Sequence, residues 1–309
     1  QIRAHAIPMK SVSEALYLRN TTFDDYERAV TADGYEQRQR YLDIVIVGGG
    51  PTGVEIAGSL AEMKKHIIAK DYNDLDRDEI NIHLIHGDAR LLNTMSEQAS
   101  AKAEQFLRDL GVELWLDKMV TGFDGDIVTI NDGSTIRTNK VIWAAGITGN
   151  TLEGLPQSAR TRGNRLKVDA FNRVEGTENI FAIGDMAFQT EEQYPEGHPQ
   201  VAQVAIQQGN LLYDNLRRLK QGKTPRPFHY RDLGSMATIG RNRAVVDLPF
   251  WRFQGAFAWL VWMFVHLFSI LGLKNKLIIF LNWVWNYITY DQSLRLVIKP
   301  WSRAEKQAG

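Results

Sequence analysis

Residues 44–69 begin with a continuous apolar run. A cluster of glycines follows, and then a helical pattern. Residues 44–47 are all β-branched, which is typical of a strand buried on both faces of a parallel sheet. Residues 48–53 read GGGPTG, and apolar residues then recur at helical spacing. We therefore expect a strand, a tight turn and a helix that reaches about Ala69.

The glycines in this turn form the pattern Gly48-x-Gly50-x-x-Gly53, the fingerprint of a dinucleotide site when a strand precedes it and a helix follows. Gly48 would allow the tight turn, Gly50 the approach of a pyrophosphate, and Gly53 close packing of helix on strand. A glycine-rich turn without a ligand is the alternative. Glu55 follows, either beside the nicotinamide end of a ligand or as an acid that complements the helix dipole.

Strand and helix patterns alternate up to residue 150, which predicts a complete α/β nucleotide module with a meander. Before this module, two helices are expected, one after the cap Ser11–Glu14 and one over residues 23–30. A charged surface connection is expected over 70–79. The other predicted elements are a helix at 96–110 and strands at 81–85, 112–116, 127–130, 135–137 and 140–146.

The next part of the chain predicts an edge strand at 168–172, a buried strand at 179–185, a helix at 199–219 and strands within 234–246. Asp185 follows a glycine at the tip of a predicted strand, where it could accept from ligand hydroxyls or cap a helix. Gln203 and Gln207 are one helical turn apart. Their amides could bind ligand carbonyls or tie down loops.

Near the C-terminus, residues 253–273 contain no Asp, Glu, Lys or Arg over 21 positions, which is long enough for a transmembrane helix. A second helix is expected over 277–290, with a polar stripe on one side and an apolar stripe on the opposite side. The polar stripe consists of Asn282, Asn286 and Tyr290, and the apolar stripe of Ile278, Phe280, Trp283 and Trp285. Aromatic density and flanking cations favour membrane association over a pair of core helices. His266, Gly255 and Gly272 fit a monotopic hairpin as well as they fit a span, so both modes of attachment stay open.

The amino-acid composition excludes several kinds of site and partner. The 309 residues can form two domains, and 36 basic and 36 acidic residues balance, so nothing overall indicates nucleic acid. From Trp251 onward there are seven Lys or Arg and only two acidic residues, which suits anionic headgroups. The absence of cysteine excludes disulfides, thiolate metal sites and redox-active dithiols, and we expect no metal.

Four motifs occur in order: IVIVGGGPTGVE at 44–55, VIWAAG at 141–146, IFAIGD at 180–185 and AQVAIQ at 202–207. Together they closely resemble the type II NADH:quinone oxidoreductases, single-subunit flavoenzymes of the membrane surface, and the resemblance covers essentially the whole chain. Disulfide reductases and sulfide:quinone reductases need cysteines that are missing here. A ferredoxin-type reductase would not need the apolar hairpin.

The resemblance implies an α/β fold with a Rossmann-like NAD-binding domain inserted in a partial FAD-binding domain, followed by a membrane-anchoring region. The corresponding segments are 1–40 (remnant of the first FAD segment), 41–150 (NAD), 151–225 (returning FAD segment) and 226–309 (membrane-associated). It further implies attachment to the cytoplasmic face of the cell membrane, a quinone as partner, and a possible homodimer.

The resemblance also implies roles for individual residues. Hydride would pass from NADH to FAD, and two electrons and two protons then to quinone, with Glu55 in positioning or proton relay and Gln203 nearest a quinone carbonyl. Asp185 would hold the ribityl chain of FAD. The implied catalytic residues are Glu55, Gln203 and Gln207, and the cofactor-binding residues are Gly48, Gly50, Pro51, Thr52, Gly53, His86, Ala145, Gly146, Gly184, Asp185 and Ala202.

Two departures qualify the resemblance. The family begins with its own GxGxxG unit for FAD, whereas this chain opens at Gln1 without an initiator Met or signal sequence. We therefore expect a fragment of a longer enzyme or, alternatively, a membrane-attached nucleotide-binding protein without turnover. His86 also stands where relatives carry a Glu for the ribose, and either Asp88 replaces that acid or the ribose is held more weakly. Arg90 suggests a 2′-phosphate but is more typical of a surface charge.

Overall fold

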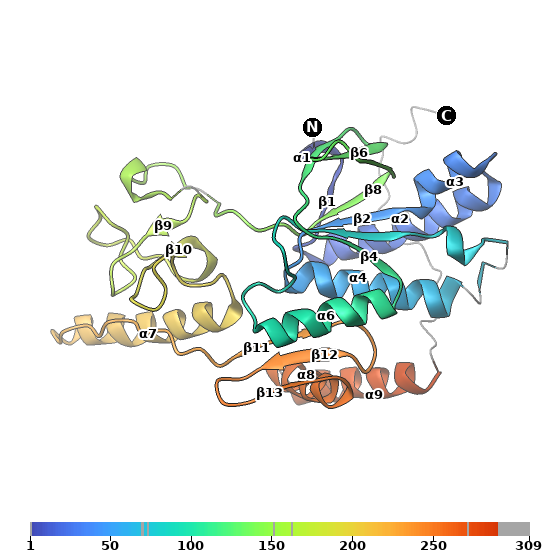
Figure 1. The fold of residues 1–309 in the computed structure, drawn as a ribbon. Coiled ribbons are helices and arrows are strands. Elements are labelled where there is room, and N and C mark those ends of the chain that lie inside the picture. Colours follow the sequence, from blue (N-terminus) through green and yellow to red (C-terminus); the bar gives the residue numbers. More distant parts are fainter. Residues whose placement is uncertain are drawn as a thin grey trace, which may run out of the picture. The chain divides into compact units, whose positions relative to one another are not determined.

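The computed structural model describes residues 2–68, 71–72, 74–150, 152–161, 163–270 and 272–289. The chain forms two compact units, which are considered one at a time: Gln1–Ala145 with Ser235–Gly309, and Gly146–Gly234 (Figure 1). The expected α/β fold is confirmed, because parallel strands and helices alternate along the first unit.

A five-stranded parallel sheet forms the centre of the first unit. The apolar run of residues 44–47 is its middle strand and is buried on both faces, as its composition predicts. The predicted strands near 81–85, 112–116 and 140–146 are confirmed as its neighbours. In spatial order the strands are β1 (Ile7–Pro8), β8 (Lys140–Trp143), β2 (Ile44–Val47), β3 (Ile82–Ile85) and β4 (Val112–Trp115).

Alternate residues of β2 pack into different layers, because successive side chains of a strand point to opposite faces. Ile44 and Ile46 face helices α4 (Pro51–Met63) and α6 (Glu97–Asp109), while Val45 and Val47 face an antiparallel meander. The helix predicted at 96–110 is confirmed, and Ser96 is its N-cap. A π-helical segment, Lys64–Ile68, continues α4, and the predicted helix end at Ala69 lies outside the described residues.

The meander consists of β5 (Val120–Phe123), β6 (Ile127–Ile130) and β7 (Thr135–Arg137). The last two strands and their Asn131–Gly133 turn are confirmed, whereas the prediction missed β5. Its Val-Thr-Gly-Phe sequence contains a glycine and a register irregularity, so local alternation alone does not reveal it.

The N-terminal region differs from its prediction. The capping box of Ser11 and Glu14 is confirmed, but it begins one continuous helix, α2 (Val12–Thr31), rather than two. Thr22 does not interrupt the helix, because its hydroxyl donates to the Leu18 carbonyl one turn earlier at 2.8 Å. Helices α1 (Ile2–His5) and α3 (Tyr35–Leu42) lie in the same unit. The assignment of residues 1–40 to a flavin domain stays a prediction.

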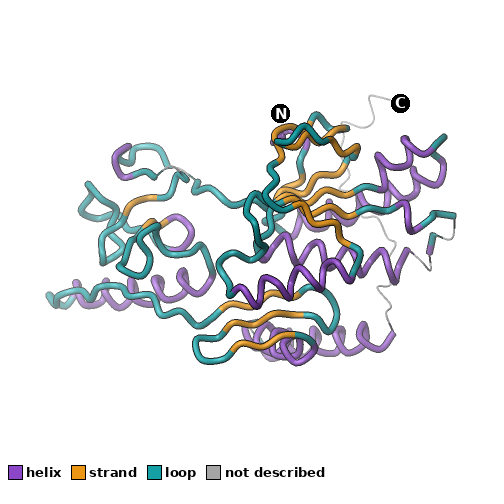
Figure 2. Tube along the Cα trace, in the orientation of Figure 1, coloured by secondary structure: helices purple, strands orange, loops and turns teal. Residues whose placement is uncertain are grey.

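The C-terminal segment belongs to the first unit. Three antiparallel strands, β11 (Ser235–Thr238), β12 (Ala244–Asp247) and β13 (Arg252–Gln254), lie between α6 and α8 (Figure 2). Asp247 holds them to the N-terminus of α6, since its carboxylate accepts from the Ser96 backbone N–H at 2.6 Å and the Ser96 hydroxyl at 3.0 Å.

The apolar segment 253–273 divides into β13 and a 14-residue helix, α8 (Ala256–Ser269), and α9 (Leu273–Thr289) follows. No helix among the described residues is long and apolar enough to cross a bilayer. The predicted stripe is wrong in one respect: Trp283 lines the same cavity as Asn286 instead of lying opposite to it. Tyr290 and residues 291–309 lie outside the described residues.

The second unit has little regular structure. It contains β9 (Leu166–Lys167), β10 (Ala187–Phe188), α7 (Ala202–Lys220) and two 3-10 turns, Gln157–Ala159 and Gly184–Met186. The helix is confirmed, but the strands predicted at 168–172 and 179–185 are wrong. These segments form only isolated bridges, and Ile180 and Ile183 are exposed, because no described strand pairs along them and covers their apolar side chains.

Candidate functional site

The glycine-rich loop shows why two of its glycines are required for packing. Gly48 has a positive φ of 115°, and a Cβ there would lie 2.6 Å from the backbone carbonyl carbon of Ala144. A Cβ on Gly53 would lie 1.8 Å from the Gly48 carbonyl oxygen. Gly50 differs, since nothing lies within 4 Å of an added Cβ. The loop is therefore closed against the sheet and open at the start of α4.

The N-terminus of α4 is suited to an anion. Gly50 is its N-cap and provides no side-chain hydrogen bond, and no acidic residue lies in the first turn. Pro51 and Thr52 are exposed. Unpaired N–H groups and the helix dipole make such a terminus attractive to phosphate. Since the helix begins at Pro51, Glu55 lies beyond its first turn, which removes the alternative role of Glu55 as a first-turn dipole partner.

Glu55 is a half-buried acid with one backbone partner. Its carboxylate accepts from the N–H of Thr238 in β11 at 3.3 Å. Burial raises the pKa of Glu55 to about 7, and the hydrogen bond from Thr238 opposes this shift only in part. The carboxyl can therefore gain or lose a proton near neutral pH, as a group that relays protons must. Sequence spacing did not reveal Thr238, which is 183 residues away.

His86 contacts the glycine loop directly. Its Nδ1 accepts from the Gly49 N–H at 3.1 Å, and a Cβ at Gly49 would lie 2.7 Å from the imidazole ring. Because Nδ1 accepts, the proton of the neutral ring is assigned to Nε2, which lies 3.4 Å from the Asp88 carboxylate. His86 thus fixes the loop conformation from the tip of β3.

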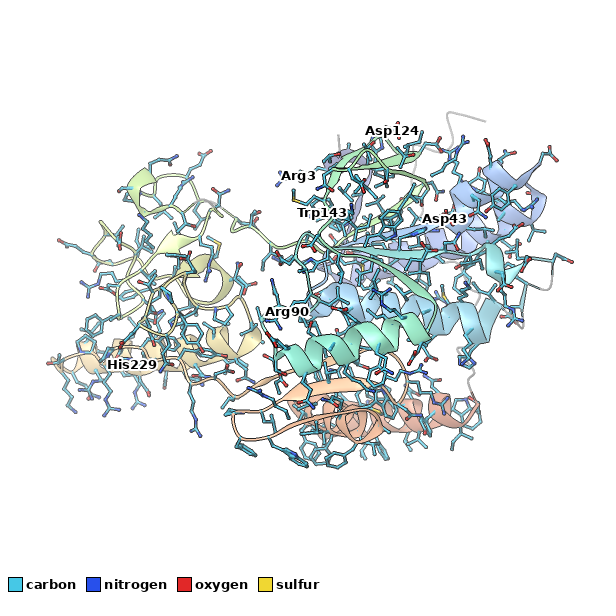
Figure 3. All side chains as sticks on the ribbon, viewed as in Figure 1. Arg3, Asp43, Arg90, Asp124, Trp143 and His229 are labelled. Carbon is cyan, nitrogen blue, oxygen red and sulfur yellow. The ribbon has the colours of Figure 1, made fainter. Side chains whose placement is uncertain are left out.

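Arg90 lies in the loop that follows β3 (Figure 3). Its guanidinium donates to the carbonyls of Asn93 at 2.8 Å and Met95 at 3.1 Å. The Asn93 amide in turn donates to Asp88 at 2.6 Å. Arg90 is therefore held by backbone carbonyls, and Asn93 is a residue of this network that the sequence patterns did not indicate.

In the second unit, Gly184 is held from α7. Its N–H donates to the buried Gln208 side chain at 2.7 Å, and its φ is +65°. The next residue, Asp185, is half-buried, and its carboxylate has no hydrogen-bond partner among the described residues. Since α7 begins at Ala202, Asp185 does not cap it. The sequence patterns did not indicate Gln208. It follows Val204, a buried residue, by four positions, so it lies on the same inward face of the helix and needs a hydrogen-bond partner there.

The two predicted glutamines have different environments. Gln207 makes two hydrogen bonds to the Arg231 backbone, donating to its carbonyl at 2.9 Å and accepting from its N–H at 3.1 Å. It therefore ties down a loop, one of the two roles left open. Gln203 is exposed and has no partner in the described part of the chain. Ala202, the first residue of α7, is also exposed, as are Ala145 and Gly146 after β8.

Comparison with known protein families shows which family the chain belongs to. Residues 5–209 match the family described as pyridine nucleotide-disulphide oxidoreductase, and residues 233–289 match the NDH2 C-terminal domain. The chain belongs to this pyridine nucleotide-disulphide oxidoreductase family. The 309 residues contain no cysteine, so they hold no disulfide of the kind in the family description.

Two relatives in the bacterium Mycobacterium tuberculosis are longer than this chain. It is 33% identical over 292 residues to the type II NADH:quinone oxidoreductase Ndh of Mycobacterium tuberculosis, covering 91% of this chain and 62% of the relative. NdhA of the same organism is 33% identical over 288 residues, with coverages of 89% and 60%. The chain thus spans about three fifths of the length of these two relatives.

A solved structure shares the fold. NDH2 of Plasmodium falciparum, in complex with NADH, aligns with a TM-score of 0.85 at 21% identity over 96% of this chain and 76% of that one. The residues present fit a dinucleotide, since the loop leaves open space at Gly50 and an uncapped helix N-terminus. No group of three or more potential metal ligands occurs among the described residues.

Proposed function

We propose that this chain is the larger part of a membrane-associated FAD-dependent NADH:quinone oxidoreductase of the respiratory chain that does not pump protons. The observation that carries the proposal is the combination, within one compact unit, of an open anion-binding loop and a half-buried acid, Glu55, whose pKa is about 7. Family membership and the four motifs support the same activity.

In the proposed reaction, the α4 N-terminus binds the pyrophosphate of NADH through its backbone N–H groups. Gly50 admits the phosphates because it presents no Cβ, and Gly48 and Gly53 hold the loop against the sheet. Bound FAD supplies the chemistry that accepts hydride and passes electrons on to quinone. Glu55 holds a proton at its carboxyl and can release or accept it near neutral pH.

The proposed nucleotide is NADH rather than NADPH. Arg90 already donates to two backbone carbonyls, and the acid Asp88 lies at the same strand tip. The 2′-phosphate of NADPH would lie close to the Asp88 carboxylate, which repels it. Arg90 would have to give up its hydrogen bonds to the backbone before it could bind that phosphate, so NADPH is disfavoured. His86 acts in this proposal by fixing the loop, in place of the acid that relatives carry.

The second unit would serve the flavin and the quinone. The Asp185 carboxylate has no hydrogen-bond partner among the described residues, which suits it to hydrogen-bond the ribityl hydroxyls of FAD. Gln203 is exposed and is proposed to donate to a quinone carbonyl, while Gln207 keeps the loop at Arg231 in place. The segments 1–40 and 151–225 are accordingly proposed as parts of one FAD-binding domain.

Attachment to a membrane is proposed through α8 and α9, at the cytoplasmic face of the cell membrane. Both helices expose large apolar side chains that water would disfavour, and Lys274 and Lys276 lie where the second helix begins. The exposed apolar residues include Phe257, Leu260, Phe264, Phe268, Leu277, Leu281, Trp285 and Ile288. A homodimer, as the resemblance implies, is included in the proposal.

The purified chain in mild detergent tests the function by two readouts. NADH binding followed by fluorescence titration should be saturable, and Gly50→Val should abolish it by blocking the pyrophosphate. Added FAD should give flavin absorption that NADH bleaches. Saturable NADH binding without flavin reduction would favour the alternative, a nucleotide-binding protein without turnover. Absence of NADH binding would reject both readings.

A further inference from the structure

A cavity of about 560 Å³ lies inside the first unit, away from the glycine loop. Its walls come from α2 and α4 on one side and from α8 and α9 on the other, with the turn after β11 completing them. The volume falls within the range of about 300–1,000 Å³ that is typical of small-molecule sites. The cavity therefore joins the nucleotide-binding part of the unit to the helices proposed to meet the membrane.

Aromatic and flexible apolar side chains line the cavity. Trp259, Trp262 and Trp283 contribute rings, and Met63 and Met263 contribute flexible thioethers. Such surfaces accommodate a hydrocarbon chain without demanding one shape. The indole Nε1 of Trp262 is buried and has no acceptor among the described residues, so an oxygen atom of a ligand can satisfy it.

The charges around the cavity favour an anion. Arg19 and Arg241 both line it, Arg241 also donating to the Tyr287 carbonyl, whereas Glu62 is the one carboxylate among the described lining residues. That carboxylate is already paired, since it lies 3.3 Å from His66 and 3.7 Å from Arg243. The side chains that a headgroup would meet are thus predominantly cationic.

We propose that this cavity binds an anionic phospholipid, with an acyl chain among the tryptophans and the phosphate next to Arg19 and Arg241. The Trp262 N–H would donate to an ester or phosphate oxygen. The inference rests on the proposed membrane attachment for the source of the lipid, because the exposed apolar faces of α8 and α9 adjoin the cavity. The lipid thereby links the membrane surface to helix α4.

Calorimetric titration with short-chain lipids below their micellar concentration tests the proposal. Dioctanoyl phosphatidylglycerol should bind saturably with one site per chain. Zwitterionic dioctanoyl phosphatidylcholine carries the same phosphate but adds a choline cation that the arginines would repel, so it should bind at least about tenfold more weakly. Arg19→Gln should weaken phosphatidylglycerol by a similar factor. The matched variant Arg28→Gln, on the exposed part of the same helix, should leave binding unchanged.

Two more variants separate binding from general damage to the fold. Glu62→Gln removes the only negative charge in the lining and should tighten phosphatidylglycerol binding, which a destabilised protein would not do. Ala15→Phe, at an exposed position that lines the cavity, should block the site, whereas Val12→Phe outside the lining should not.

Three outcomes would each overturn the inference. They are equal affinity for the two lipids, displacement of the lipid by an uncharged short-chain quinone, and unchanged lipid binding by Ala15→Phe. NADH titration of the same samples keeps the two proposals apart. Lipid binding without NADH binding would reject only the proposed function, and NADH binding without lipid binding would reject only the lipid site.

Discussion

The two units are stabilised in different ways. In the first, β2 is completely buried and its alternate residues pack into two apolar layers. In the second, the two strands have two residues each, and side-chain to backbone hydrogen bonds replace much of the sheet. Examples are Gln208 with Gly184, and Asn215, which bonds both the N–H and the carbonyl of Arg226 at 2.8 Å.

This difference has a physical consequence. Apolar burial scales with area and is lost in proportion to the side chains that are displaced, whereas a buried hydrogen bond is lost as a single event with an unsatisfied group left behind. We therefore expect the first unit to be most sensitive to steric change and the second to be most sensitive to removal of a few polar side chains.

The largest effect is expected at Gly53. In Gly53→Ala the new methyl group would meet the Gly48 carbonyl oxygen, and the overpacking should lower the free energy of unfolding by about 3 kcal/mol or more. Denaturant unfolding followed by circular dichroism measures this. Gly50→Ala is the matched control, since its methyl group enters open space; an equal loss in both variants would contradict the steric explanation.

The next effect concerns Glu55 and pH. Because the folded pKa of about 7 exceeds the ordinary value of 4.5, the native state keeps a proton that the unfolded state has lost. The contribution of Glu55 to stability should therefore be fully present below about pH 4.5 and be lost as the pH rises through 7, by up to about 3 kcal/mol. Glu55→Gln should flatten this dependence in unfolding experiments between pH 5 and 8. An unchanged slope would show that another group is responsible.

In the second unit, Gln208→Ala should cost about 2 kcal/mol, because it leaves the buried N–H of Gly184 without an acceptor. Hydrogen exchange of that amide should accelerate together with the exchange of α7. Gln203→Ala, one turn earlier on the exposed side, should leave exchange unchanged. If both variants behaved alike, the polar contacts would not be what stabilises this unit.

The smallest effect is expected at His86. The variant His86→Phe keeps a ring against Gly49 but removes the Nδ1 acceptor, so stability should fall by about 1 kcal/mol. NADH affinity should fall about fivefold, because the loop is less well fixed. Fluorescence titration measures the affinity, and Asp88→Asn tests whether the second ring contact contributes. Unaltered affinity in His86→Phe would remove His86 from the nucleotide site.

Local patterns were sufficient for much of the fold. The apolar run, the glycines and the helix from residues 44 to 63 follow from periodicity and from the space that a Cβ would need, and the caps at Ser11 and Ser96 follow from local hydrogen bonding. The order of the four motifs also identified the family. The elements and caps depend on residues that are close along the chain, and the motifs depend on residue identity and order, so the sequence alone determined them.

Only the tertiary structure decided the contacts between distant residues. The Thr238 N–H reaches Glu55 across 183 positions, His86 lies on Gly49, and α2 lines one cavity with α8 and α9. It also decided that residues 179–185 form no strand. A strand needs a partner along its whole length, and whether an apolar segment finds one depends on the rest of the fold, which its own residues do not encode.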